Sequence, residues 1–230
     1  MIGRRREFLG WLGAGTVAVL TGRGMAAQIS GNGTRLRTGS SLTPVSRDWD
    51  VSWVERIHGD ARAVFDVPSP GEGDGVWRAG RWREDYAEVY GVDAGDVTPV
   101  LVIRHEAIQL IMDDEYWKRF DVGKRLKMHS HEGKGWTESN PVSGAAKDSG
   151  GDFDRYSLQY FIAHGGIVLA CHMAFRGRVV PDYVKSDGLD DAAAEARARE
   201  HIIPGIILQP SGVFAVLRAQ QAGCSYLLAS

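Results

Sequence analysis

The hydrophobic positions follow two alternating patterns from residue 62 to the end of the chain. Apolar runs typical of strands occupy five segments: residues 62–67, 100–103, 167–171, 206–208 and 225–228. Apolar residues at helical spacing fill the intervals, at residues 80–90, 106–112, 156–164, 190–203 and 211–222. This order predicts an α/β fold with a single doubly wound, mostly parallel five-stranded sheet and helices on both faces.

Three stretches fall outside that alternation. Residues 27–48 are rich in Gly, Ser, Thr and Arg and have no apolar period, which indicates a flexible linker before a domain of residues 49–230. Residues 69–75, Ser-Pro-Gly-Glu-Gly-Asp-Gly, predict a loop with unusual backbone angles. Residues 121–152 have no clear period and predict a long loop insertion.

The amino terminus has the pattern of an export signal. Residues 5–9 read Arg-Arg-Glu-Phe-Leu and resemble the twin-arginine consensus, in which two arginines precede any residue, then Phe and Leu. The apolar run that follows is thinned by glycines and is short for a stable membrane span, and small residues at 24 and 26 suit cleavage. We expect residues 1–26 to direct the chain through the twin-arginine translocase to the periplasm. An uncleaved amphipathic anchor is the alternative.

Charge separates this expected signal from the rest of the chain. The formal net charge is −2, and residues 1–26 hold four arginines against one glutamate, so that the mature chain is near −5. An acidic balance argues against nucleic acid or an anionic membrane surface as the main partner. We expect no cofactor, because no cofactor-binding motif is recognisable in the sequence.

Several short segments resemble the DsrE-like family of small α/β proteins. They are Val-Ile-Arg-His at 102–105, Ala-His-Gly-Gly at 163–166, Ala-Cys at 170–171, Ile-Pro-Gly at 203–205, Gln-Pro-Ser-Gly-Val at 209–213 and Leu-Arg-Ala-Gln at 217–220. The resemblance implies a flavodoxin-like fold, frequent homo-oligomers and, in some members, sulfur transfer through a cysteine persulfide. In those members the cysteine lies just ahead of the helix that here begins near Tyr156, and residues 154–157 contain no cysteine.

Polar and glycine-rich groups follow several predicted strands. Ligands of open α/β sheets bind outside the carboxyl ends of the strands, which predicts a binding rim there. The candidate residues of this rim are Gly71, Gly73, Gly75, His105, Glu106, Cys171, His172, Arg176 and Ser211.

Cys171 is the sharpest chemical candidate on this rim. A helix amino terminus or a neighbouring cation lowers the pKa of a thiol and makes it nucleophilic, and His172 and Arg176 follow closely. The alternatives are a buried apolar thiol or, in an oxidising compartment, a disulfide with Cys224. His105 either assists a ligand as an acid or base or simply bonds to a neighbouring loop.

The long loop contains a weak metal candidate. His129 and His131 alternate as ligands do on an extended segment, but no third ligand stands at a recognisable spacing, so a polar loop is the favoured interpretation.

Three functions remain open at this point. The leading interpretation is an exported, non-catalytic or weakly catalytic domain that binds a small ligand at the rim as a homo-oligomer. The second is a cysteine-based sulfur carrier or thiol enzyme, with Cys171 as the nucleophile and His105 or His172 assisting. The third is a structural or interaction subunit that associates through exposed aromatic residues.

Overall fold

The computed structural model describes residues 42–46, 48–130, 135–144 and 156–229. The expected signal peptide, most of the expected linker and His131 lie outside the described residues. Within them, five strands form one sheet: β1 (Ala61–Val67), β2 (Val97–Ile103), β3 (Ile167–Cys171), β4 (Ile207–Gln209) and β5 (Ser225–Leu228). Their order is β4-β3-β2-β1-β5 and every pair is parallel, which confirms the predicted α/β fold class.

The central strands are buried on both faces, as their continuous apolar sequences predict. All seven residues of β2 are buried. Phe65 pairs in register with Leu101, and both side chains belong to the larger hydrophobic cluster; Val64 pairs with Val100, and both belong to the smaller cluster. Successive residues of a strand point to opposite faces of the sheet. The paired residues of β1 and β2 therefore contribute alternately to the larger and the smaller cluster.

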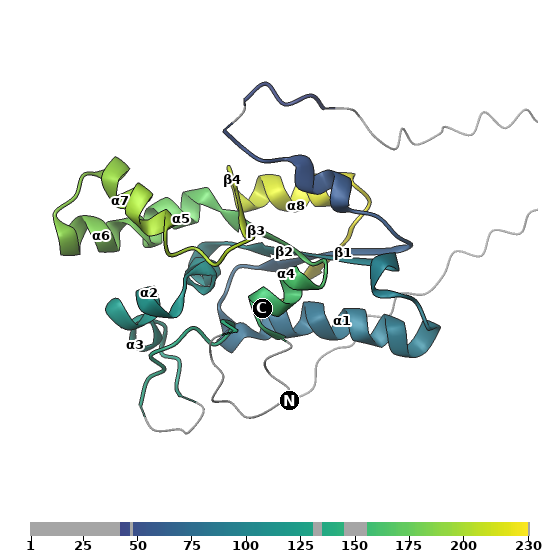
Figure 1. The fold of residues 1–230 in the computed structure, drawn as a ribbon, viewed down its shortest axis with the longest axis horizontal. Coiled ribbons are helices and arrows are strands. Elements are labelled where there is room, and N and C mark those ends of the chain that lie inside the picture. Colours follow the sequence, from purple (N-terminus) through teal and green to yellow (C-terminus); the bar gives the residue numbers. More distant parts are fainter. Residues whose placement is uncertain (1–41, 47, 131–134, 145–155, 230) are drawn as a thin grey trace, which may run out of the picture. The chain divides into compact units, whose positions relative to one another are not determined.

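Most helices lie on the face of the larger cluster. They are α1 (Asp74–Tyr90), the 3-10 helix η4 (His105–Ile111), α2 (Asp114–Arg119), α3 (Val122–Leu126), α4 (Leu158–Ala163), α5 (His172–Arg178), α6 (Val180–Asp187) and α7 (Asp191–Arg199). The opposite face is covered by α8 (Gly212–Gln221) and by the 3-10 helix η1 (Ser52–Arg56), which Figure 1 shows on the other side of the sheet from α1 and α4.

The segment before β1 crosses this second face from the carboxyl ends of the strands to their amino ends. The Gln209 side chain donates a 2.7 Å hydrogen bond to the Asp50 carbonyl at the carboxyl edge, and Arg56 donates to the Gly166 carbonyl at the amino edge. Between them Trp53 is fully buried in the smaller cluster. The residues ahead of the first strand are therefore packed on the sheet from Asp50 onward.

Several elements differ from the sequence expectation. Helix α1 begins at Asp74, inside the expected glycine-rich loop, and the segment expected as a helix at 106–112 is a 3-10 helix. Helix α3 lies within the expected 121–152 loop, and α5 and α6 occupy residues 172–187, where no element was predicted. No helix in the described part of the chain is long and apolar enough to cross a membrane.

Candidate functional site

An ion pair lies at the carboxyl edge of the sheet. Asp66, near the end of β1, is 3% exposed and receives two hydrogen bonds from Arg104, which follows β2: Nε to Oδ1 at 2.6 Å and Nη2 to Oδ2 at 2.8 Å. The Tyr226 hydroxyl of β5 donates to the same carboxylate at 3.0 Å. A bidentate arginine–carboxylate pair fixes the guanidinium geometrically. Asp66 of β1, which also accepts a hydrogen bond from Tyr226 of β5, thus holds the Arg104 guanidinium in place.

Arg104 also contacts the start of α8. A Cβ atom at Gly212 would lie 2.6 Å from Arg104 Cδ, so glycine at this position is what allows the arginine to lie against the helix. The hydrogen bonds that Arg104 donates to Asp66 raise the pKa of Arg104 against the lowering effect of burial, and electrostatic interactions with Asp66, Tyr226 and Cys171 raise it further. Ile103 of β2 pairs in register with Ala170 of β3, so the residues that follow them, Arg104 and Cys171, lie at the ends of neighbouring strands.

Ser211 caps α8, as its sequence predicts. Its backbone is extended and its Oγ accepts a 3.1 Å hydrogen bond from the Phe214 amide. The first turn of a helix leaves backbone N–H groups without intrahelical partners and carries a partial positive charge. The amino terminus of α8 and the Arg104 guanidinium, which is paired with Asp66, therefore lie side by side on the rim.

Cys171 ends β3 and starts α5. Its Sγ accepts a hydrogen bond from the Ala174 amide at 3.4 Å, and the residue is 8% exposed. Its Cα pairs with that of Gln209 on β4, whose Oε1 has no hydrogen-bond partner among the described residues. Cys171 and Cys224 are both free thiols and are not joined in a disulfide.

His172 and Arg176 point to a second cluster, which joins α5 to α7. His172 Nε2 lies 2.8 Å from Glu195 Oε1, and Arg176 Nε lies 3.5 Å from the other oxygen of that carboxylate. Burial raises the pKa of Glu195, but hydrogen bonds from His172 and Arg199 outweigh it and leave that pKa below its ordinary value. The Trp49 ring packs edge-on against His172, with centroids 5.2 Å apart.

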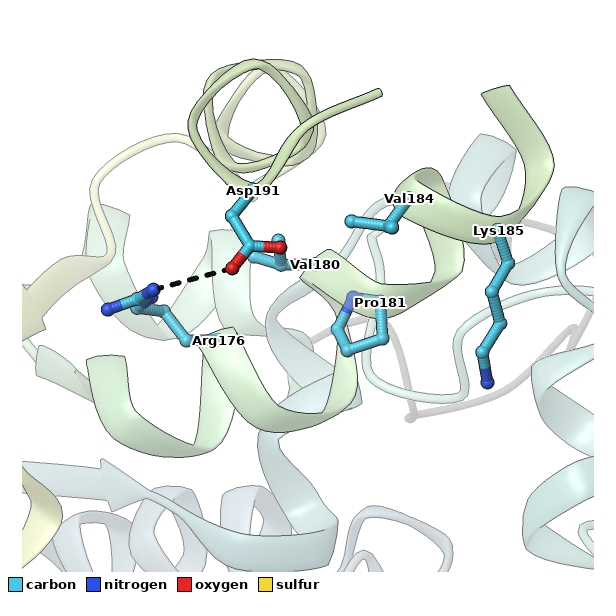
Figure 2. A pocket seen from close by; sticks show the side chains of 6 residues that line it. All are labelled: Arg176, Val180, Pro181, Val184, Lys185 and Asp191. Carbon is cyan, nitrogen blue, oxygen red and sulfur yellow. Dashed lines mark ion pairs between the residues drawn. The ribbon is translucent and has the colours of Figure 1, made fainter. Parts of the chain in front are cut away.

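A small hollow lies beside this second cluster. Figure 2 shows it between α5, α6 and α7, where Arg176 and Asp191 face one another 4.0 Å apart. Its volume is ≈ 200 Å³, and Val180, Pro181 and Val184 supply its apolar lining. Arg176 faces the acidic side chains of Asp191 and Glu195 on α7, and Lys185 of α6 is the other cationic side chain that lines the hollow.

The two other residues expected after β2 lie at the surface. His105 is exposed and adopts a left-handed backbone conformation with φ of 50°, which is uncommon for a residue other than glycine. Glu106 is exposed and lies 3.6 Å from Arg178 of α5. His105 follows Arg104 directly in the chain, whereas the Glu106 side chain faces Arg178, the last residue of α5.

The expected glycine loop has a packing explanation at two of its three glycines. A Cβ at Gly73, where φ is 96°, would lie 2.4 Å from Val142, and a Cβ at Gly75 would lie 2.6 Å from Val67 and 2.9 Å from the Ala229 carbonyl. Gly71 has φ of 44°, and a Cβ there would make only ordinary contact with the Asp74 side chain, at 3.8 Å. These contacts bring α1 close to the end of β1, so the glycines there position a helix.

His129 is exposed, and its ring stacks on Trp136 with centroids 4.4 Å apart. Its expected partner His131 is outside the described residues. In the part of the chain that the structure describes, no three His, Cys, Asp or Glu side chains gather as a metal site.

The structure thus brings Cys171 and Ser211 together around a residue that the sequence did not single out, Arg104. Asp66 and Tyr226 were also missed. Asp66 had a visible signal, because it is a carboxylate within an otherwise apolar strand, and such a group must be paired when buried.

Comparisons of the chain with protein-family models, with curated proteins and with solved structures find no match.

Proposed function

We propose that the chain binds a small anionic ligand at the carboxyl edge of the sheet, in the space bounded by Arg104, the amino terminus of α8 and Cys171. The observation that carries the proposal is the fixed guanidinium: Asp66 holds Arg104 by two hydrogen bonds, and Gly212 allows it to lie against α8. Helix amino termini and arginines both favour anions, and here they coincide.

The chemistry available at this place suits binding more than a reaction. Arg104 uses Nε and Nη2 for Asp66, so its Nη1 remains for a ligand oxygen. The amides of Gly212 and Val213 lie in the first turn of α8, where intrahelical partners are lacking. Donors of these kinds suit the oxygens of a phosphate, sulfate or carboxylate group.

A cysteine-based carrier or thiol enzyme is the second candidate, and it uses the same place. Cys171 lies at the start of α5, on the strand next to the one that ends before Arg104, which is a setting typical of a reactive thiol. The resemblance of residues 203–220 to DsrE-like proteins supports this sulfur chemistry, although the family's carrier cysteine is absent at 154–157. The anion site and the thiol are compatible, because an oxidised sulfur anion is itself a possible ligand.

Self-association is part of the proposal, and an exposed apolar surface supports it. Strand β5 forms one edge of the sheet and is exposed along its whole length. With the adjacent α8 it exposes six large hydrophobic side chains: Val213, Phe214, Leu217, Tyr226, Leu227 and Leu228. An uncharged strand edge favours pairing with another chain, and a second copy is the proposed partner. Sedimentation of the protein as a monomer at 100 μM or more would contradict this part.

We also propose that the domain works in the periplasm after twin-arginine export. The Arg-Arg-Glu-Phe-Leu sequence at residues 5–9 supports this location. Replacement of both Arg5 and Arg6 by lysine is expected to leave the chain in the cytoplasmic fraction.

The ligand proposal is tested by thermal unfolding in phosphate against sodium chloride of equal ionic strength. Phosphate is expected to raise the Tm of the full chain, since a ligand that binds only the native state stabilises it. Ser211→Ala should reduce this phosphate-dependent rise. Ser157→Ala is the matched control, because Ser157 caps α4 by the same type of hydrogen bond, to the Tyr160 amide, away from the rim. Equal Tm values in the two salts would overturn the proposal.

A further inference from the structure

A second and larger cleft lies between the start of α1 and the segment that follows residue 140. Its volume is ≈ 400 Å³, twice that of the hollow in Figure 2. The residues that line it are Glu72, Gly73, Asp74, Trp77, Pro141, Val142 and Tyr156. The volume is within the range of small-molecule sites in proteins, and the lining mixes aromatic rings with carboxylates.

Two aromatic rings form walls of this cleft. Trp77 is 45% exposed, which is unusual for the largest apolar side chain, and its ring centroid lies 6.2 Å from that of Tyr156 at an interplanar angle of 59°. The Tyr156 hydroxyl donates a 3.0 Å hydrogen bond to Glu84, which fixes the phenol. Gly80 provides the space, since a Cβ there would be 3.0 Å from the Tyr156 ring. The planes of the two rings are therefore tilted relative to each other and not stacked.

The charge beside these rings is negative. Asp74 and Glu72 both line the cleft, and Asp74 shares its charge with Arg78 at 3.6 Å. Glu72 has no hydrogen bond or ion pair among the described residues, and its backbone is left-handed, with φ of 54°. The amino terminus of α1 contributes a partial positive charge, about half an elementary charge, which a full carboxylate charge exceeds.

We propose that this cleft binds a quaternary ammonium group, of the kind found in choline. Such a cation has methyl groups in place of N–H donors, so it needs apolar and aromatic contact in place of hydrogen bonds. Ring faces attract it through their negative quadrupole, and a nearby carboxylate adds Coulomb attraction. Trp77 and Tyr156 supply the aromatic rings, Pro141 and Val142 supply apolar contact, and Glu72 supplies the charge.

The test compares choline with 3,3-dimethyl-1-butanol, which has the same shape with carbon in place of the charged nitrogen. Calorimetric titration of the full chain is expected to show saturable binding of choline and binding about tenfold weaker, or none, for the neutral alcohol. Equal affinities for the two compounds would overturn the proposal, because the cleft would then select by shape alone. Absence of saturable choline binding would overturn it as well.

Two variants locate the binding, each with a matched control. Trp77→Ala and Glu72→Gln are expected to weaken choline binding by about tenfold each. Trp136→Ala removes another ring of similar exposure (40%), and Glu55→Gln removes another exposed carboxylate; neither lines the cleft, and both should bind choline normally. Circular dichroism confirms that each variant is folded. Loss of binding in the controls, with binding retained in Trp77→Ala, would contradict this site.

Discussion

Asp66 and Arg104 form a two-point ion pair across the carboxyl ends of β1 and β2, with nitrogen–oxygen distances of 2.6 and 2.8 Å. The carboxylate is 3% exposed, so neither solvent nor another cation among the described residues can take the place of the guanidinium. The pair has two consequences. We expect it to stabilise the domain, and we propose that it fixes the cation that faces the ligand.

The first prediction concerns the stability of this pair. Asp66→Asn leaves Arg104 without its partner charge, and we expect the free energy of unfolding to fall by about 3 kcal/mol, since breaking a buried pair costs 3–5 kcal/mol. Urea denaturation of both single variants and of Asp66→Asn with Arg104→Gln should show strong coupling between the two positions.

The matched control for this cycle is the exposed pair Arg81–Asp85, whose side chains are 42% and 49% exposed. Coupling there should be far weaker than at Asp66 and Arg104, because solvent screens exposed pairs. Additive effects at Asp66 and Arg104 would mean that the pair contributes nothing as a unit.

The second prediction tests the packing role of the glycine-rich segment at residues 69–75. Gly75→Ala places a Cβ 2.6 Å from Val67 and 2.9 Å from a carbonyl, so we expect a loss of about 2 kcal/mol in unfolding free energy by urea denaturation. Gly95→Ala, which has nothing within 4 Å, should change stability by less than about 0.5 kcal/mol. A Gly75→Ala protein as stable as the parent would show that α1 can move away from β1 at no cost.

The third prediction uses the pH dependence of Cys224. Burial raises the pKa of this thiol from 9.0 to about 11, and Arg62 lowers it only in part. The unfolded chain therefore loses this proton at lower pH than the native state, and the native state loses stability as pH rises from about 9 to 11. Alkylation of Cys224 should still accelerate between pH 9 and 10. Cys224→Ala should remove this part of the alkaline stability loss. A rate plateau at or below pH 9 would contradict the raised pKa.

The fourth prediction concerns Glu195 at acid pH. Its pKa is lowered below 4.5, because hydrogen bonds from His172 and Arg199 outweigh the effect of burial. The stabilisation is present above pH 4.5 and is lost as pH falls through the native pKa. The difference in unfolding free energy between the parent and Glu195→Gln should therefore shrink below that pH. Glu200→Gln, in an exposed pair with Arg197, should show little difference at any pH. A gap that persists unchanged to pH 3 would contradict the assignment.

The sheet could be predicted because its strands are chemically simple. Residues 100–103 and 167–171 are continuous apolar runs, and a parallel sheet covered on both faces requires that pattern. Ser211 likewise has the sequence context of a cap and occupies that position. These local rules hold because tertiary packing agrees with them.

The missed elements are those where packing overrides local pattern. Residues 105–111 form a 3-10 helix whose last five side chains are buried all round, so no amphipathic period distinguishes its type. Helices α5 and α6 are separated only by Val179, and α5 contains Gly177. The two short helices therefore show no clear helical period in the sequence. In the candidate site, Arg104 gains its role from contacts with Asp66 and Gly212, residues 38 and 108 positions away in the chain. Such long-range contacts leave no local pattern.

The central claim is that the start of α8 and Arg104 together bind an anion, and amide NMR measures this most directly. In a titration of the full chain with phosphate at constant ionic strength, the Gly212 and Val213 amide resonances are predicted to shift along a saturable curve. The amides of Ala192 and Ala193, in the first turn of α7, provide the internal control, because Asp190 and Asp191 place carboxylates in that turn and the neighbouring Arg176 is paired with acidic side chains of α7. Unchanged Gly212 and Val213 resonances, or shifts of equal size at Ala192 and Ala193, would contradict a binding site at the carboxyl edge of the sheet.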